Sequence, residues 1–291
     1  MPTGSILRES LTLVGPGRAG RALARSWRGA GGRLEDVIGR DRFSAERAVR
    51  EIPGGNPRAL AEARSDCDIL VLAVPDDVIA PVALTLAGQV SCRIAFHLSG
   101  ALSSEALRPL AQAGVSTGSL HPLRAFTGAP AETWRDALVA IEGEEEAARS
   151  AVALAGAIGA RAQRISSEGK ALYHAAATLA AGGTVALLSL AASAWVAAGF
   201  PEPEARAALA ALAVGAASAA GEQPFNDALT GAVARRDIGT IRAHAEALRG
   251  SPGALQVYAL LAEETLRRTP GRGKEQEIRA LLASQAVDGK R

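Results

Sequence analysis

The stretch Leu11-Thr-Leu-Val-Gly-Pro-Gly-Arg-Ala-Gly20 decides the fold of this chain, because a short apolar run leads there into a glycine-rich turn. The glycines have the G-x-G-x-x-G spacing of a dinucleotide-binding turn. Gly15 permits the tight turn, Gly17 lets a pyrophosphate approach the backbone, and Gly20 lets a helix pack close to the sheet. The N–H groups at the start of that helix attract phosphate. We therefore expect cofactor contacts from Gly15, Pro16, Gly17, Arg18, Ala19 and Gly20.

The spacing alone is weak evidence, because a chain with 31 glycines contains such triplets by chance. The alternative is a plain strand–turn–helix that binds nothing. The context favours the dinucleotide turn, since the motif follows a strand-like run and precedes a run with helical spacing, Arg21–Trp27.

The composition is that of a soluble chain long enough, at 291 residues, for two domains. The net charge of +2 gives no reason to expect nucleic acid or an anionic membrane as a partner. Cys67 and Cys92 share no C-x-x-C spacing, so we expect buried thiols in a reducing cytoplasm and no metal site. No signal peptide is visible, because Met1–Ser10 lacks a long apolar core. The expected location is therefore the cytoplasm.

One segment, Ala171–Phe200, contains no Asp, Glu, Lys or Arg over a length that could span a membrane. It is rich in Ala and interrupted by His174, Gly182 and Gly183. Because Ala contributes little to membrane insertion, we expect a buried helix within a helical domain and no membrane partner.

The first half of the chain alternates short apolar runs with helix-like runs, which predicts an α/β doubly wound, mainly parallel sheet. The helix-like runs are Ser44–Ile52, Ser103–Ala113 and Glu144–Ile158. The expected strands are Leu11–Val14, Asp36–Gly39, Ile69–Val74, Ile94–Leu98, Val115–Leu120, Leu138–Ile141 and an edge strand at Ala162–Ile165.

The second half is Ala- and Leu-rich with helical spacing and no strand signal, which predicts an all-helical domain. We place a Rossmann domain at residues 1–165 and a helical substrate and dimerisation domain at residues 166–291. The Ala-rich helices offer a plausible homodimer surface. The polar tail from Thr269 is expected to be partly disordered.

The cofactor preference depends on Val37-Ile-Gly-Arg-Asp-Arg-Phe-Ser44, about twenty residues after the glycines, where the second strand ends at the ribose. Arg40 at this point suits a 2′-phosphate through charge-assisted hydrogen bonds, which favours NADP(H). NAD(H) stays the alternative, because Asp41 could accept the 2′-OH. A second cofactor contact is expected at Val74 and Pro75, where a buried strand ends.

Two histidines lie at the carboxyl ends of strand-like runs. This is the sheet edge where ligands bind in doubly wound folds. His121 follows Gly118-Ser-Leu, and His97 precedes Leu98-Ser99. A histidine near neutral pKa can exchange a proton with a substrate hydroxyl or carbonyl. The alternative is that each histidine only caps a strand end.

Lys170 and His174 form the second candidate pair, since positions i and i+4 share a helix face. Lys170 is the only lysine outside the C-terminal tail, in a chain whose other cations are nearly all Arg. Lys can release a proton and Arg cannot, so a proton-transfer or carbonyl-polarising site would use Lys. The alternative is a surface lysine at a helix start.

These residues resemble a known family, the Rossmann-like proteins that carry domain of unknown function 2520. The resemblance spans almost the whole chain. The segments that carry it are Gly15-Pro-Gly-Arg-Ala-Gly20, His97-Leu-Ser-Gly100, Ser119-Leu-His-Pro-Leu123, Lys170-Ala-Leu-Tyr-His174 and Leu229-Thr-Gly231, with Ala234-Arg235 and Asp237.

That family is similar to the 6-phosphogluconate-dehydrogenase-like superfamily, which includes ketopantoate, pyrroline-carboxylate and deazaflavin-dependent reductases and prephenate dehydrogenases. The resemblance implies a Rossmann domain, a helical domain and often a dimer. Lys170 matches the Lys of the Lys-x-x-x-Asn pair in ketopantoate reductases, but His174 replaces the Asn. His121-Pro122 matches a His-Pro of prephenate dehydrogenases, whose acidic residue before the Gly-Ser turn is absent here. The substrate is left open by both departures.

The sequence thus supports a hypothesis of hydride transfer between NADP(H) and a small carbonyl, imine or hydroxy compound. Lys170 would polarise the carbonyl or relay a proton, His121 and His174 would orient substrate, and Ser99 would hydrogen-bond near the nicotinamide. One rival is an NADP(H)-binding sensor or scaffold without catalysis. Another is a prephenate-dehydrogenase-like enzyme, with Arg124 as a candidate carboxylate contact.

Overall fold

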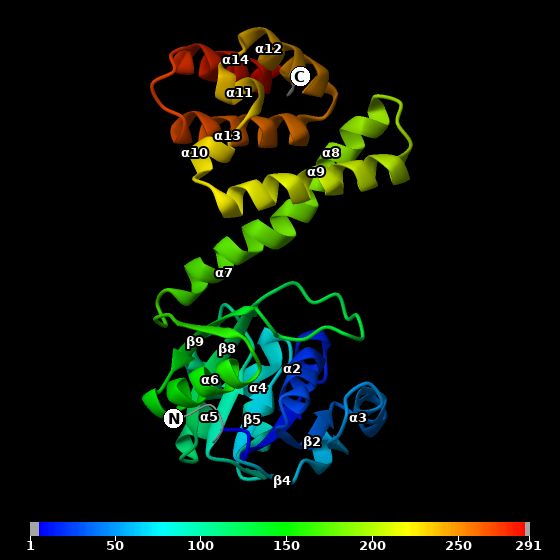
Figure 1. The fold of residues 1–291 in the computed structure, drawn as a ribbon, viewed down its shortest axis with the longest axis vertical. Coiled ribbons are helices and arrows are strands. Elements are labelled where there is room, and N and C mark those ends of the chain that lie inside the picture. The colour runs from blue at the N-terminus through cyan, green and yellow to red at the C-terminus, as the bar shows by residue number, and fades with distance from the viewer. Residues whose placement is uncertain (1–5, 289–291) are drawn as a thin grey trace. The chain divides into compact units, whose positions relative to one another are not determined.

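The computed structural model describes residues 6–288, which divide into two compact units between Leu179 and Ala180 (Figure 1). The first unit is the α/β domain expected from the alternating pattern. The second contains only helices among its described residues. The helix that begins at Lys170 starts in the first unit, so this division falls after the boundary predicted near residue 165.

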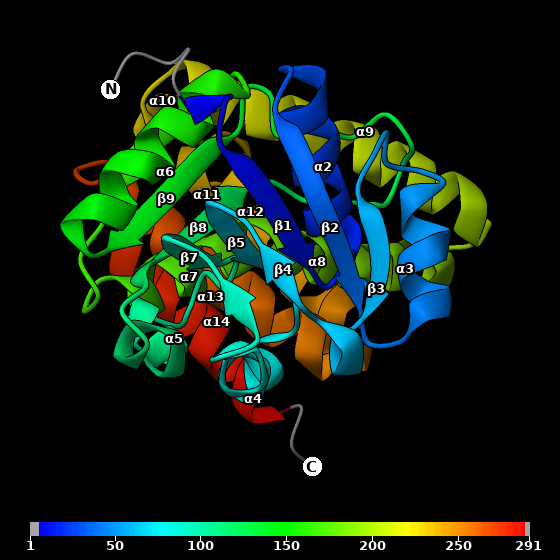
Figure 2. The same ribbon diagram turned by 90° about the horizontal axis from the view of Figure 1, so that it is seen from below.

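The first unit is built on one eight-stranded sheet, in the order β10-β9-β8-β7-β5-β1-β2-β3 (Figure 2). A separate two-stranded sheet pairs β4 with β6. The strands are β1 (Ser10–Val14), β2 (Arg33–Gly39), β3 (Asn56–Ala59), β4 (Ser65–Asp66), β5 (Ile69–Leu72), β6 (Val90–Ser91), β7 (Ile94–His97), β8 (Ser116–Leu123), β9 (Leu138–Gly143) and β10 (Arg161–Arg164).

The strand order reverses at β1, which pairs in parallel with β2 on one side and with β5 on the other. All other pairs in the large sheet are parallel except β8 with β9, which is antiparallel. The prediction of a mainly parallel doubly wound sheet is therefore confirmed. Such a reversal opens a crevice at the carboxyl ends of the strands, where ligands of these folds bind.

The apolar strands are buried on both faces of the sheet. Leu13 and Val71 pack with the first-unit helices α2 and α6, whereas Leu70 and Leu72 pack with α4 and α5 on the other face. This explains why the strands read as continuous apolar runs. The helices of this unit are α2 (Arg18–Gly29), α3 (Arg42–Val49), η1 (Leu60–Glu62), α4 (Asp76–Leu86), η2 (Ser104–Leu107), α5 (Arg108–Gln112), α6 (Glu145–Ala157) and α7 (Lys170–Thr178).

The sequence pattern missed β3 and the two short strands β4 and β6, and it merged two helices into one. β3 reads Asn-Pro-Arg-Ala and has no apolar run, yet it pairs with β2 at the sheet edge. An edge strand needs only backbone partners on one side, so its side chains carry little signal. The single helix expected over Ser103–Ala113 divides into η2 and α5, with Pro109 in the first turn of α5.

The second unit has its core in three helices near its C-terminal end. Ile241, Leu255 and Ile278 are buried together, one from each of α12, α13 and α14. The polar tail from Thr269, expected to be partly disordered, carries α14, whose apolar residues pack into this core, and residues 289–291 lie outside the described residues. The elements of this unit are η3 (Leu179–Gly183, beginning one residue before the division), α8 (Thr184–Ala197), α9 (Glu202–Glu222), α10 (Phe225–Ala228), α11 (Gly231–Arg235), α12 (Ile238–Ala247), η4 (Leu248–Gly250), α13 (Pro252–Arg268) and α14 (Glu275–Asp288).

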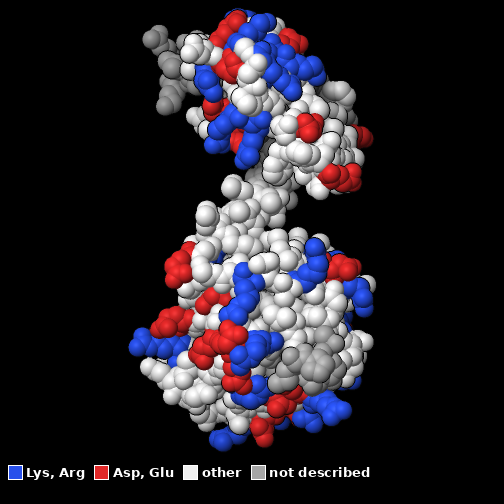
Figure 3. All heavy atoms as spheres, turned by 60° about the vertical axis from the view of Figure 1, so that its left-hand side comes forward, with Lys and Arg blue, Asp and Glu red and all other residues white. Residues whose placement is uncertain are grey.

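The segment expected to be a buried helix is a helix, but it is exposed in the single chain. Lys170–Ala197 is helical throughout and, by length and composition alone, could cross a membrane, with a mean hydropathy of 1.7. Figure 3 shows part of this segment as a surface without charged side chains. Leu172 and Val185 are 78% and 69% exposed. The prediction of burial is therefore wrong for the chain by itself, because no described part of the chain covers these side chains.

Candidate active site

The glycine turn has the geometry that its spacing predicts. Gly15 has a φ of +79°, a left-handed conformation that favours glycine. A Cβ placed on Gly15 would lie 2.5 Å from Cγ1 of Val74 and 2.7 Å from the carbonyl oxygen of Ala73. A Cβ on Gly20 would lie 2.9 Å from Cβ of Ala73, so both glycines permit close packing between the turn and the end of β5.

Gly17 differs from its two neighbours, because the space in front of it is open. A Cβ there would meet only the Ala73 carbonyl oxygen, at 3.9 Å. Gly17 is also the N-cap of α2, and no side chain caps this helix end or places a carboxylate in its first turn. The first N–H groups of α2 therefore stay available to an anion. This turn fits the pyrophosphate of a dinucleotide.

Arg40 lies directly after β2, where the ribose end of a dinucleotide is expected. Its side chain is 90% exposed and, within residues 6–288, bonds only to the neighbouring Asp41, from Nε to Oδ2 at 3.1 Å. The Asp41 carboxylate also caps α3, accepting the Ser44 N–H at 2.7 Å. This backbone hydrogen bond lowers the pKa of Asp41. The guanidinium is thus free to turn toward a ligand, whereas the carboxylate is held by the helix.

His97, at the end of β7, is fully buried and fixes the loop that follows it. Its Nδ1 accepts the Ser99 N–H at 3.1 Å, so its proton lies on Nε2, which donates to the Ser103 carbonyl at 3.0 Å. Burial lowers the pKa of His97 to about 4. Both ring nitrogens are used by the backbone, as the capping alternative expects.

The depressed histidine pKa predicts a loss of stability in mild acid. Burial also lowers the pKa of His121 to about 4, against an ordinary value of 6.5. Between pH 6.5 and pH 4 the unfolded chain takes up protons at His97 and His121 that the folded chain refuses. The free energy of unfolding should therefore fall by about 2 kcal/mol per histidine from pH 7 to pH 5.

Urea unfolding of the His97→Gln variant at the two pH values tests this expectation. The amide of Gln can replace one donor and one acceptor but does not titrate, so about half of the pH dependence should disappear. A variant as sensitive to acid as the unaltered chain would contradict the assignment.

The Ser99 hydroxyl is also engaged within the loop. It donates to Oδ2 of Asp76 at 2.7 Å and accepts the N–H groups of Ala101 and Leu102. Asp76 lies in the first turn of α4, directly after Pro75, which caps that helix. Ser99 therefore joins the β7 loop to the turn after β5, next to the Val74 side chain that packs on Gly15.

Lys170 is completely buried, which excludes the alternative of a surface lysine. Its Nζ donates to the Ser99 carbonyl at 3.2 Å and to the Ser119 hydroxyl at 2.7 Å. Burial lowers the pKa of Lys170, and the nearby carboxylates of Glu142 and Asp76 oppose this shift. The ammonium therefore lies directly behind the backbone that leads into Gly100.

Glu142 extends this network on the side of β9. Its Oε2 accepts the Ser119 hydroxyl at 3.3 Å and the Ser104 N–H at 2.8 Å. A chain of hydrogen bonds thus runs from Lys170 through Ser119 to a buried carboxylate. A buried cation with compensating carboxylates is costly to lose on one side only.

His121 and His174 meet over Gly100. Their ring centroids are 5.4 Å apart and their planes lie at 86°. A Cβ on Gly100 would stand 2.8 Å from Nε2 of His121 and 2.3 Å from Nδ1 of His174. The other nitrogen of His121, Nδ1, lies 2.8 Å from the Tyr173 hydroxyl. The structure therefore brings together His121, His174, Lys170 and the Ser99 loop, as the sequence predicts.

Two parts of the chain match known protein families. Residues 5–122 match the family described as Rossmann-like domain, and residues 137–265 match the Domain of unknown function (DUF2520). The chain therefore contains a Rossmann-like domain followed by a DUF2520 domain. No curated protein matches it in sequence.

Solved structures share the fold of this DUF2520 protein. A candidate NADP oxidoreductase from Bacteroides fragilis is 21% identical, with a TM-score of 0.74, over 90% of this chain and 99% of that one. The protein TM1727 from Thermotoga maritima is 24% identical, with a TM-score of 0.68, over 97% and 100%. A Plasmodium falciparum pyrroline carboxylate reductase with NADP bound is 11% identical, with a TM-score of 0.57, over 97% and 98%.

Sequence reasoning missed four polar residues of this site, namely Asp76, Ser119, Glu142 and Tyr173. Ser119 and Tyr173 lie in the same motif segments as His121 and His174, and this was the available signal. Glu142 comes from β9 and Asp76 from the start of α4, and only the fold brings them near Lys170.

Proposed function

We propose that this protein is an NADP(H)-dependent oxidoreductase that moves a hydride to or from a small carbonyl, imine or hydroxy compound. The observation that carries this proposal is the continuity between the open glycine turn and the lysine–histidine cluster. Val74 packs on Gly15, Asp76 binds Ser99, and the Ser99 carbonyl binds Lys170. A nucleotide on the turn would therefore share one sheet edge with groups suited to proton exchange.

The cofactor would lie on the glycine turn and the segments beside it. The residues proposed to hold it are Gly15, Pro16, Gly17, Arg18, Ala19, Gly20, Arg40, Val74 and Pro75. The open backbone at Gly17 and the uncapped start of α2 would receive the pyrophosphate. The free guanidinium of Arg40 suits a 2′-phosphate, which favours NADP(H) over NAD(H). Once bound, the nicotinamide supplies the hydride chemistry.

The chain would supply position and charge. His121 and His174 would orient the substrate through the nitrogens that meet over Gly100. Lys170, a buried cation that can release a proton, would polarise the carbonyl or relay a proton, and its lowered pKa favours release. Ser99 would act near the nicotinamide mainly by holding the loop before Gly100, since its hydroxyl is already bonded.

The solved relatives support the reaction class. The Bacteroides fragilis protein is described as a candidate NADP oxidoreductase, and the Plasmodium falciparum enzyme is a reductase with NADP bound. Both share the fold over almost all of their length. Their names do not specify a substrate for this chain.

The test is turnover of NADPH with a panel of small acceptors, followed by the absorbance of the reduced nicotinamide. The panel contains 2-oxo acids, aldehydes, cyclic imines and a deazaflavin. We expect oxidation of NADPH with at least one carbonyl or imine, and slower oxidation of NADH with the same acceptor. Binding of NADPH with no turnover of any acceptor would instead favour the sensor without catalysis.

We also propose that a second copy of the chain covers the exposed apolar helix Lys170–Ala197, giving a homodimer. The helix carries no charged side chain after Lys170 and is rich in Ala, which allows close helix packing. An exposed apolar surface along a helix of 28 residues marks an interaction surface.

A further inference from the structure

Tyr173 and His174 are consecutive on α7, and both face His121 on β8. The ring of His121 lies 5.5 Å from that of Tyr173, centroid to centroid, with the planes at 86°. The same ring meets His174 at almost the same distance and angle. The His121 imidazole thus contacts the rings of Tyr173 and His174 in an edge-to-face arrangement. Tyr173 also forms a hydrogen bond with it.

The direction of this hydrogen bond follows from the partners that the tyrosine has. Burial raises the pKa of Tyr173, so its hydroxyl keeps its proton, and the lowered pKa of His121 keeps the imidazole neutral. Within residues 6–288, Nδ1 of His121 is the one hydrogen-bond partner of the Tyr173 hydroxyl. If Nδ1 donated instead, the phenolic proton would have no acceptor among these residues, so we take the hydroxyl as the donor and place the single proton of the imidazole on Nε2.

Nε2 of His121 and Nδ1 of His174 both lie close against Gly100. Nδ1 of His174 is buried and has no hydrogen-bond partner in the described part of the chain. Buried polar atoms without partners are rare in folded proteins, and such an atom beside a donor indicates a place for a ligand.

We infer that Tyr173 is a positioning residue that fixes His121 as an Nε2–H donor, and that this donor and His174 bind an uncharged carbonyl or imine beside Gly100. The inference rests on the proposed function and specifies the kind of substrate group that binds next to His121 and His174. The donor that faces the ligand is the neutral imidazole of His121, which offers a hydrogen bond without charge. Lys170 donates to Ser99 and Ser119, and the carboxylates of Glu142 and Asp76 near it offset its charge. A carbonyl or imine accepts a hydrogen bond from such a donor without needing a counter-charge.

Nitrogen-15 NMR of the imidazoles tests the positioning role without any turnover. In the unaltered protein we expect His121 as one tautomer with a protonated Nε2. In Tyr173→Phe we expect a mixture of tautomers at His121 and no change at His97, whose nitrogens are fixed by backbone groups. A protonated Nδ1 in the unaltered protein, or an unchanged His121 in the variant, overturns the inference.

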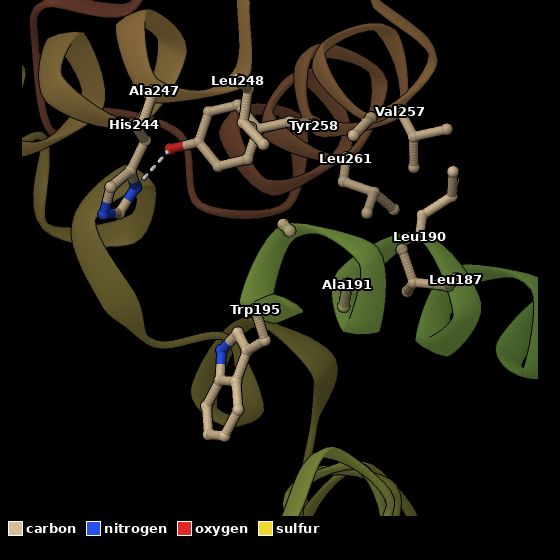
Figure 4. A pocket seen from close by; sticks show the side chains of 12 residues that line it. Leu187, Leu190, Ala191, Trp195, His244, Ala247, Leu248, Val257, Tyr258 and Leu261 are labelled. Carbon is tan, nitrogen blue, oxygen red and sulfur yellow. Dashed lines mark hydrogen bonds between the residues drawn. The ribbon is translucent and has the colours of Figure 1, made fainter. Parts of the chain in front are cut away.

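The chain offers a matched control, because its only other tyrosine makes the same contact elsewhere. The Tyr258 hydroxyl lies 3.1 Å from Nδ1 of His244, with ring planes at 85° (Figure 4). Tyr258→Phe should change the tautomer of His244 alone. For an acceptor found in the panel, Tyr173→Phe should lower kcat/KM by about two- to tenfold, the effect of one neutral hydrogen bond, and Tyr258→Phe should not.

Acetamide and acetate, which have the same shape and differ in charge, test the ligand class in the presence of NADP⁺. Acetamide should shift the signals of His121 Nε2 and His174 Nδ1 more than acetate does. Gly100→Ala should abolish the acetamide shift, because its Cβ would stand 2.3 Å from Nδ1 of His174 and 2.8 Å from Nε2 of His121 and would push the two rings from their positions. A larger shift with acetate, or no shift with either probe, overturns the ligand class while leaving the proposed oxidoreductase activity open to its own assay.

Discussion

Replacement of Lys170 by Met should lower kcat by about 10²- to 10³-fold while the affinity for NADPH stays unchanged. The side chain is completely buried and its ammonium bonds to the Ser99 carbonyl, next to the residue over which the histidines meet. A positive charge at this place stabilises the negative charge that develops on the substrate oxygen during reduction. The glycine turn is a separate structure, so cofactor binding should survive. Steady-state turnover and NADPH titration measure the two effects.

The same variant should also lose stability, because Glu142 and Asp76 lie near Lys170 and would remain as carboxylates without that cation. We expect a loss of about 3–5 kcal/mol in the free energy of unfolding, so the assays belong well below the melting temperature. Lys274→Met is the control, since Lys274 is exposed in the second unit. Ser119→Ala removes one partner of the lysine and leaves its charge. Full turnover in folded Lys170→Met would show that the lysine has no part in the reaction.

Replacement of Arg40 by Ala should raise the Kd for NADPH by about ten- to a hundredfold and leave the Kd for NADH almost unchanged. A charge-assisted hydrogen bond is worth about 1.5–3 kcal/mol, and only NADPH carries the 2′-phosphate that would accept it. Arg40 is 90% exposed and pairs with the adjacent Asp41, so the protein loses little stability with it. Fluorescence titration with the two reduced cofactors measures the ratio.

The matched control lies at the other end of the same strand. Arg33 begins β2, is 66% exposed and pairs with Glu35 at 3.1 Å. Arg33→Ala changes the net charge by the same amount, far from the expected ribose position, and should affect neither cofactor. Equal losses of NADPH and NADH affinity in Arg40→Ala would contradict the preference for NADP(H).

The sheet could be predicted because its strands are buried on both faces. A strand such as β5, Ile-Leu-Val-Leu, has to be apolar at every position, so the sequence shows it directly. The glycine turn could be predicted for a similar reason, since a φ of +79° and a contact of 2.5 Å leave room for no other residue at Gly15. The edge strand β3 could not be predicted, because edge strands need no apolar pattern. The exposure of the helix Lys170–Ala197 could not be predicted either, because exposure depends on what covers a helix.

What the sequence determined by itself is therefore local: the turn that admits a phosphate, the alternation that builds the sheet, and the i, i+4 pair of Lys170 and His174. Tertiary structure decided what these residues do. The register of β8 against β7 and β9 places Ser119 between Lys170 and Glu142, and Lys170 is a buried cation in the folded chain. The packing of α7 on the sheet makes Tyr173 a partner of His121. Such contacts join residues more than fifty positions apart, and only the folded backbone sets their distances.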